Sequence, residues 1–216
     1  DDQLVIEEKG IYSIENFLIS RRLMYWQVYL HKTSTSGEQL LVKILERARE
    51  LALQGKELFA TPALQHFLAK TITEEQFFTE DIHLAQFVKL DDQDIFTAIK
   101  VWEGEADPVL SNLCRMLTTR SLYKTEISNE PASEDRVNML KENVSAVLGI
   151  SREEAGYFVF TDVIRNRAYD AGSTSNIKIL MKNNTLTDIA QASDLSNIAS
   201  LDKTVKKHIL CYPRII

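Results

Sequence analysis

The chain has 216 residues, 44% of them hydrophobic, which is enough for a sizeable core and excludes a disordered protein. Its formal net charge of −6 excludes a body that is cationic overall, as a general binder of nucleic-acid duplexes would be. With only 7 Gly and 4 Pro, the composition favours long helices over a β-sandwich with many tight turns.

The first part of the chain has the periodicity of helices. Apolar residues recur at helical spacing, and residues that begin or end helices stand between these stretches. The predicted helices, with their start and stop signals, are 14–32 after a capping Ser13, 38–53 before Gly55, 63–69 after Thr61-Pro62, one that begins at the capping-box sequence Thr73 to Gln76, and 109–122 after Asp107-Pro108. Together they predict a helical bundle over residues 1–126.

After residue 126 the pattern changes to that of a small α+β module, residues 127–216. The stretch 125–136 is polar and charged and predicts an exposed loop or a linker. The predicted strands and connections are the strands 157–160, 177–181 and 205–212, a turn at 171–174 and a short crossover at 186–198. Residues 157–216 hold 8 basic and 5 acidic side chains, so this module is the basic part of an acidic chain.

The first long helix carries two cations among apolar side chains. On a helical wheel Arg21 and Lys32 fall in the middle of an apolar stripe, and the opposite side is apolar too, so we expect this helix to be buried between other elements. A buried cation needs a partner, either a carboxylate in a structural salt bridge or an anionic ligand such as a phosphate. Tyr25 and Tyr29 on the same side suit a base or sugar held next to phosphates.

Two parts of the chain resemble HD-superfamily phosphohydrolases. The first, within residues 10–33, looks like the helix that follows the HD core and has the pattern R-x7-Y-x-H-K, formed by Arg21, Tyr29, His31 and Lys32. The second is a segment at 90–95 followed by the R-x3-K pair of Arg120 and Lys124. The resemblance is closest to bacterial relatives of the sterile-alpha-motif/HD-domain deoxynucleotide triphosphohydrolase and covers residues 10–124.

The resemblance implies a divalent metal held by two His and two Asp, with one His-Asp pair adjacent in the sequence. This chain has four His and no His-Asp dipeptide, so the HD core and its metal are expected in an N-terminal segment outside it. The chain, which does not begin with Met, is expected to be part of a longer protein, to bind no metal and to be inactive alone. Arg21 and Tyr29 are then expected on a surface that the absent segment leaves open.

The resemblance also implies two places where nucleotides bind. At the active site, Arg21 matches an arginine that binds substrate phosphates and Tyr29 matches a tyrosine at the sugar end of the pocket. Tyr25 stands where the vertebrate enzyme has a histidine near the substrate. The residues that match a regulatory site for a nucleotide triphosphate, at a subunit interface, are Arg120, Lys124 and Lys182.

The residues by themselves leave structural alternatives open. Arg120 and Lys124, predicted one helical turn apart at the end of a helix, also stand where the helix dipole favours basic side chains. His31 is interpreted as a structural residue at a helix C-terminus. His66 and His83 fall on amphipathic helices without a further ligand at metal-binding spacing, and we interpret them as structural too.

These patterns predict a mainly α protein, a helical bundle followed by a small α+β module, that is the C-terminal portion of a metal-dependent hydrolase of nucleotides, with deoxynucleoside triphosphates as expected substrates. The alternative is a non-catalytic module for regulation or oligomerisation that binds nucleotide. The expected partners are the N-terminal HD-core segment, a nucleotide and further copies of the chain, with no membrane and no nucleic acid. Cys114 and Cys211 lack metal-binding spacing and indicate free thiols in a cytoplasmic protein rather than a disulfide.

Overall fold

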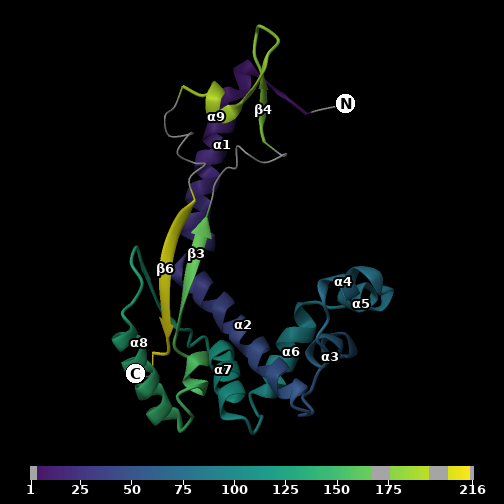
Figure 1. Cartoon of the computed structure of the whole chain (residues 1–216), viewed down its shortest axis with the longest axis vertical. Helices are drawn as coiled ribbons and strands as arrows, with labels where there is room; N and C mark the ends of the chain where they lie inside the picture. The colour runs from purple at the N-terminus through teal and green to yellow at the C-terminus, as the bar shows by residue number, and fades with distance from the viewer. Residues whose placement is uncertain (1–3, 167–175, 195–203, 215–216) are drawn as a thin grey trace. The chain divides into compact units, whose positions relative to one another are not determined.

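The computed structural model describes residues 4–166, 176–194 and 204–214. The chain is mainly helical, a helical domain followed by a small α+β module, as the sequence predicts (Figure 1). The helices, including the short turns η1 and η3 and the π-helical segment η2, are η1 Glu8–Gly10, α1 Ile11–Met24, η2 Tyr25–Tyr29, α2 Lys32–Leu53, α3 Pro62–Leu68, α4 Glu74–Thr79, α5 Asp81–Phe87, α6 Asp92–Trp102, α7 Pro108–Thr118, α8 Glu134–Leu148, η3 Glu154–Tyr157 and α9 Ile189–Ala192. The strands are β1 Ile6–Glu7, β2 Lys124–Ser128, β3 Phe160–Asn166, β4 Lys178–Leu180, β5 Leu186–Asp188 and β6 Val205–Tyr212.

Two predicted helix starts are confirmed by their capping hydrogen bonds. The Thr61 hydroxyl accepts a bond from the Leu64 amide at 3.4 Å, and Pro62 opens α3. Thr73 and Gln76 form the predicted capping box at the start of α4. Each cap satisfies an amide that has no partner within the first helical turn, and for that reason a few neighbouring residues are enough to place such a start.

The predicted start of the first helix is wrong. α1 begins at Ile11, with Gly10 rather than Ser13 at its N-cap position. Gly10 lies against the first strand so closely that a Cβ atom there would be 2.6 Å from Cγ2 of Ile6. A side chain at this position would therefore force Ile6 or the backbone to shift, and the close approach places β1 next to the beginning of α1.

The second half differs from the prediction in where its elements lie. The predicted loop 125–136 contains most of β2 and the start of α8, which buries Leu140 and Val144 one helical turn apart. The predicted strand 157–160 is mostly η3 and loop, and β3 starts only at its last residue. The predicted strand 205–212 is confirmed as β6, and the second sheet has the order β2-β6-β3. The predicted turn at 171–174 lies outside the described residues.

The chain forms two compact units that interleave along the sequence, and they do not coincide with the consecutive segments 1–126 and 127–216. The first unit comprises Asp1–Ser34, Ile127–Pro131 and Asp162–Ile209, and the second comprises Thr35–Glu126, Ala132–Thr161 and Leu210–Ile216. In the first unit β1 pairs in parallel with β4, and β4 pairs in an antiparallel manner with β5. Its buried cluster consists of Ile11, Leu18, Ile179 and Ile189.

The second unit has its core along α2. The buried side chains on this helix follow helical spacing and are Leu40, Ile44, Ala48 and Leu51. Trp102 of α6 is also fully buried, and its indole N–H donates to the Phe59 carbonyl at 2.9 Å. Among the residues that the structure describes, no helix combines the length and the apolar composition needed to cross a membrane.

One guanidinium ties distant segments of the second unit together. Arg47 of α2 is 8% exposed and donates two hydrogen bonds to Asp107, at 3.1 Å from Nε and 2.6 Å from Nη2. It also donates to Glu50 at 2.9 Å and to Glu154 at 3.2 Å. Asp107 accepts a further bond from the Leu110 amide at 2.7 Å, which confirms Asp107-Pro108 as the start of α7. A single carboxylate thus caps one helix and holds the guanidinium of another.

Removal of the Arg47 guanidinium should destabilise the chain strongly. In Arg47→Ala we expect the free energy of unfolding in urea to fall by about 3 kcal/mol or more, because Asp107 would keep its buried charge without a cation. Arg152→Ala is the matched control, since Arg152 is 57% exposed and lies 4.0 Å from Glu142. The control should lose less than about 1 kcal/mol. Equal losses in the two variants would contradict this account of the Arg47 cluster.

The pair of Arg47 and Asp107 should also make the free energy of unfolding depend on pH in the acid range. Burial alone would raise the pKa of Asp107, but the hydrogen bonds from Arg47 and the Leu110 amide hold it below its ordinary value of 3.8. A carboxylate with a lowered folded pKa contributes stability above its ordinary pKa and loses that contribution as the pH falls through the folded value. In urea titrations below about pH 4, Asp107→Asn should therefore lose less stability with falling pH than the unsubstituted chain. Parallel pH profiles would contradict this.

Candidate functional site

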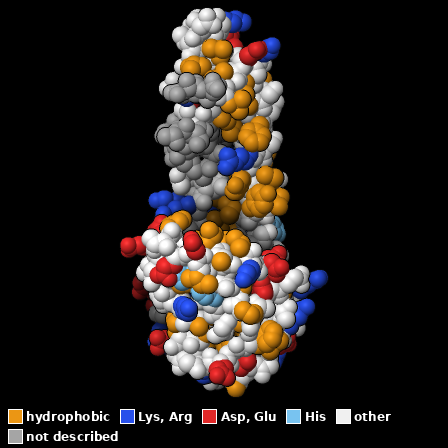
Figure 2. Space-filling model, turned by 90° about the vertical axis from the view of Figure 1, so that its right-hand side faces the viewer, with side chains coloured by type: hydrophobic (Ala, Val, Ile, Leu, Met, Phe, Trp, Pro, Cys, Tyr) orange, Lys and Arg blue, Asp and Glu red, His pale blue; other side chains and the backbone are white. Residues whose placement is uncertain are grey.

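The active-site residues predicted from the sequence lie together in the first unit. Arg21 and the two tyrosines, Tyr25 and Tyr29, border a hollow of about 580 Å³ on α1 and η2. The other residues that line this hollow are Phe17, Ser20 and Met24. Figure 2 shows apolar side chains gathered along the upper part of the molecule, over the unit that contains this helix.

The π-helical segment sets the spacing of the tyrosines. The Leu30 amide donates to the Tyr25 carbonyl five residues earlier, at 2.7 Å, in place of the usual bond between residues four apart. The rings of Tyr25 and Tyr29 lie side by side with centroids 5.2 Å apart and an interplanar angle of 56°. Sequence periodicity did not predict this segment, because its residues fit an ordinary helix equally well. Such segments occur frequently at functional sites.

Arg21 packs against an aromatic ring. Its guanidinium carbon lies 5.6 Å from the centroid of the Tyr25 ring, a cation–π contact. None of the carboxylates in the described part of the chain lies within ion-pairing distance of Arg21. The buried carboxylate of α1 belongs to Glu15, which accepts a hydrogen bond from the Ser193 hydroxyl at 2.5 Å. The local arrangement thus favours the anionic-ligand alternative over the structural salt bridge for Arg21.

The expectation that the first helix is buried on two sides is wrong. One side is indeed buried, through Ile11, Leu18 and Glu15. On the other side Phe17 is 56% and Tyr29 is 52% exposed. The hollow next to Arg21 is therefore open to solvent in this chain.

Lys32 and His31 do not belong to the same helix as Arg21. Lys32 is the first residue of α2 and is exposed, so its predicted place in the middle of a buried stripe is wrong. His31 stands at the start of α2, where its Nδ1 accepts a hydrogen bond from the Thr33 amide at 3.3 Å. It also directly follows Leu30, the C-cap of η2, and its amide donates to the Val28 carbonyl at 3.4 Å, so His31 lies at a helix C-terminus as predicted, where the chain turns between η2 and α2.

Arg120 and Lys124 do not share a helix face, which corrects the prediction that they lie one helical turn apart. α7 ends at Thr118, where the hydroxyls of Thr118 and Thr119 both donate to the Arg115 carbonyl. Arg120 then adopts a left-handed conformation with φ of 57°, and Lys124 begins β2.

Each of the predicted regulatory lysines has a partner of its own. The ammonium of Lys124 lies 5.3 Å from the centroid of the Tyr212 ring, and its interaction with Tyr212 raises the pKa of Lys124. Lys182 belongs to the first unit, where its amide donates to Glu8 at 2.8 Å and its ammonium lies 3.5 Å from the same carboxylate. The two lysines are thus in separate units, and Lys182 is the one that pairs with a carboxylate among the described residues.

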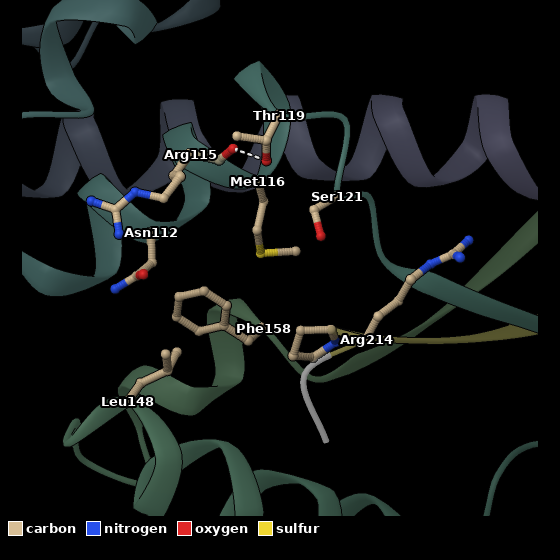
Figure 3. A pocket seen from close by; sticks show the side chains of 9 residues that line it. Asn112, Arg115, Met116, Thr119, Ser121, Leu148, Phe158 and Arg214 are labelled. Carbon is tan, nitrogen blue, oxygen red and sulfur yellow. Dashed lines mark hydrogen bonds between the residues drawn. The ribbon is translucent and has the colours of Figure 1, made fainter.

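Two features escaped the sequence analysis. His66 and His83, which the sequence places on separate helices without a link, are hydrogen-bonded between Nε2 and Nδ1 at 2.8 Å. A small cavity of about 160 Å³ lies beside α7, with Met116, Leu148 and Phe158 among its lining residues (Figure 3). In Figure 3 the guanidinium groups of Arg115 and Arg214 point to opposite sides rather than toward each other.

No group of three or more His, Cys, Asp or Glu side chains in the described parts of the chain could hold a metal ion. These residues therefore do not fit the divalent metal that the HD superfamily uses. Cys114 and Cys211 are both buried, and burial raises the pKa of the Cys114 thiol to about 12. A thiol of this kind is neutral at physiological pH and is a poor metal ligand.

Comparison with known proteins places these observations in a family context. Residues 1–68, which include α1, η2 and α2, match the family model described as the HD associated region. The chain is 52% identical to a phosphohydrolase of known crystal structure from Bacteroides thetaiotaomicron, with a TM-score of 0.88 over 99% of this chain and 53% of that one. A hypothetical protein from Aquifex aeolicus, at 23% identity and a TM-score of 0.52 over 98% of this chain and 44% of its own, shares the fold.

A curated relative is likewise matched over about half of its own length. The chain is 30% identical to the uncharacterized protein YwfO of Bacillus subtilis over 99% of its own length. It spans about half of that relative, 48%, and about half of the Bacteroides phosphohydrolase. These likenesses support the predicted resemblance at its coarser level. The chain is similar to about half the length of HD-associated, phosphohydrolase-like proteins.

Proposed function

We propose that the chain is the C-terminal portion of an HD-domain phosphohydrolase that acts on nucleotides, with deoxynucleoside triphosphates as substrates. The observation that carries this proposal is Arg21, an arginine without a carboxylate among the described residues, beside two tyrosine rings in an open hollow. The hollow lies within the residues that match the HD associated region. Its remaining walls would come from the N-terminal HD-core segment.

The side chains around the hollow have chemistry that suits a nucleotide. A guanidinium binds phosphate oxygens through charge-assisted hydrogen bonds, and Arg21 would neutralise charge that develops on the phosphate during hydrolysis. Tyr25 holds the guanidinium through its ring, and Tyr29 offers an aromatic surface to the sugar or base. A divalent metal would be held by the HD core, outside this chain, and would supply Lewis-acid chemistry at the phosphate.

The exposed apolar residues of this helix support the need for a partner. Leu23, Met24 and Val28 are 50%, 44% and 55% exposed on α1 and η2, next to the hollow. Several exposed large apolar side chains on one short helical stretch favour an interaction site there. We propose the N-terminal HD-core segment as its partner, and further copies of the chain as a second kind of partner in a homo-oligomer.

The alternative is a non-catalytic module that binds a regulatory nucleotide through Arg120, Lys124 and Lys182. It has less support, because Lys182 pairs with Glu8 and because Arg120, which is on neither a helix nor a strand, does not share a helix face with Lys124. Under this alternative, loss of nucleotide binding would follow from changes at Arg120 or Lys124 rather than from changes at Arg21.

Substitution of Arg21 in the full-length protein tests the catalytic proposal. In Arg21→Ala we expect kcat/KM for hydrolysis of deoxynucleoside triphosphates to fall by about 100-fold or more, because a charge-stabilising group is lost. The matched control is Arg22→Ala, an arginine on the same helix that does not line the hollow. Thermal unfolding would establish that both variants fold. Activity within a factor of about three of the unsubstituted protein in Arg21→Ala would refute the proposed role.

Substitution of Arg120 separates the two functions. Its left-handed backbone is unfavourable for a residue with a side chain, so Arg120→Gly should leave the free energy of unfolding unchanged or raise it by about 1 kcal/mol. Calorimetric titration of the full-length protein with a deoxynucleoside triphosphate should give the same affinity and stoichiometry in this variant as in the unsubstituted protein. Loss of a bound nucleotide per chain in Arg120→Gly would instead favour the regulatory alternative.

A further inference from the structure

A second hollow, in the other compact unit, has a composition unlike that of the first. It has a volume of about 320 Å³ and lies between α2, α3, the following loop and the start of α6. Its apolar lining includes Leu64, Phe67 and Leu68 of α3 and Ile72 of the loop. No acidic side chain lines it, and its polar lining consists of two cations, Arg49 and Lys70.

The Arg49 charge is not neutralised within the described chain. Its guanidinium makes only long hydrogen bonds to neutral oxygens, 3.4 Å to the Lys70 carbonyl and 3.5 Å to the Thr71 hydroxyl. The acidic residues close to it on α2 are engaged by other cations, Glu46 by Lys43 and Glu50 by Arg47. Arg49 is therefore available to an anion that enters the hollow.

The acidic residues next to the lining residues at the start of α6 also have hydrogen-bond partners. Asp91 and Asp94 flank the lining residues Leu90 and Ile95 in the sequence, but both carboxylates accept backbone amides at the start of α6. They act as helix caps and contribute to no ion pair among the described residues. An anion beside Arg49 and Lys70 would thus meet two cations and an apolar wall.

We propose that this hollow binds a small anionic amphiphile, a straight-chain carboxylate of medium length. The carboxylate would lie at Arg49 and Lys70, and the hydrocarbon chain would cover the apolar side chains of α3 and α6. The volume equals that of about ten water molecules, so it suits a chain of about eight to ten carbons better than a full membrane lipid. Apolar walls with a few convergent polar groups are typical of small-molecule sites.

A neighbouring histidine supplies a way to observe the carboxylate. His66 of α3 precedes Lys70 by four residues, and its pKa is lowered by partial burial, by the charge of Lys70 and by His83. Glu80 lies 3.2 Å from the other nitrogen of His83 and is the acidic group at this pair. An anion bound to Lys70 would reduce the repulsion, so the pKa of His66 should rise on binding.

The test is calorimetric titration of the chain with sodium decanoate, kept below its micelle concentration, with decanol and acetate as the uncharged and the short comparison ligands. We expect decanoate to bind with one site per chain and at least about tenfold more tightly than either comparison ligand. Because the two cations lie at a partly solvated rim, Arg49→Gln and Lys70→Gln should each weaken binding by about threefold to fivefold, and the double variant by about tenfold or more.

Lys100→Gln is the matched control, an exposed lysine of α6 that does not line the hollow, and it should bind decanoate as the unsubstituted chain does. Leu90→Glu, which places a carboxylate on the lining, should abolish binding while thermal unfolding shows that the chain folds. In NMR titrations the pKa of His66 should rise with decanoate and stay constant with decanol.

Two results would overturn the proposal. Equal affinity for decanoate and decanol would show that the cations play no part. The other result is that decanoate does not bind and that the chain self-associates. If Leu90→Glu removes this self-association, the hollow is an interface between copies.

Discussion

The packing of the second unit depends on one buried guanidinium, which requires negatively charged partners around it. Arg47 is nearly inaccessible to solvent and can be stable there only because carboxylates from α2, from the start of α7 and from η3 converge on it. Tyr157 extends this cluster, since its hydroxyl donates to Glu50 at 2.7 Å. Segments separated by more than a hundred residues are thereby fixed around a single point of charge. Well-packed apolar residues in place of such a cluster give a protein comparable stability. We therefore interpret the cluster as a device that specifies which segments meet.

The contrast between Arg47 and Arg21 separates a structural arginine from a candidate for ligand binding. Both carry a permanent charge, and both lie against a tyrosine ring at 5.6 Å. Arg47 has three carboxylate partners, whereas Arg21 has none among the described residues and borders an open hollow. Arg49, two residues from Arg47 on the same helix, resembles Arg21 in this respect. The distribution of acidic partners, rather than the residue type, thus marks where an anion can bind.

Features set by neighbouring residues were predictable from the sequence, and features set by distant contacts were not. Thr61, Thr73 and Asp107 each bond to amides within three residues, so their helix starts follow from local order alone. The loop predicted at 125–136 failed because β2 is a strand only through its pairing in a sheet with β6, far away in the sequence. The pairing of Arg120 with Lys124 failed because α7 ends at Thr118 and Arg120 then adopts a left-handed backbone, which periodicity alone does not reveal. At the site, the residues Arg21, Tyr25 and Tyr29 were identified, but their exposure and the absence of a carboxylate required the structure.

The π-helical segment has a consequence for how the first unit can change in evolution. A segment of this kind holds one residue more per turn than its surroundings, so it behaves as a one-residue insertion that the helix absorbs. Deletion of one residue between Tyr25 and Tyr29 would let the backbone return to the ordinary helical path. Because the wider π turn already absorbs the extra residue, the part of α1 on its N-terminal side would keep about the same rotation relative to Tyr29. Deletion of one residue between Arg21 and Tyr25, where the helix has ordinary α geometry, would instead turn Arg21 by about 100° away from Tyr29. The loss of a single codon is therefore tolerated by the hollow within the π-helical segment and not before it.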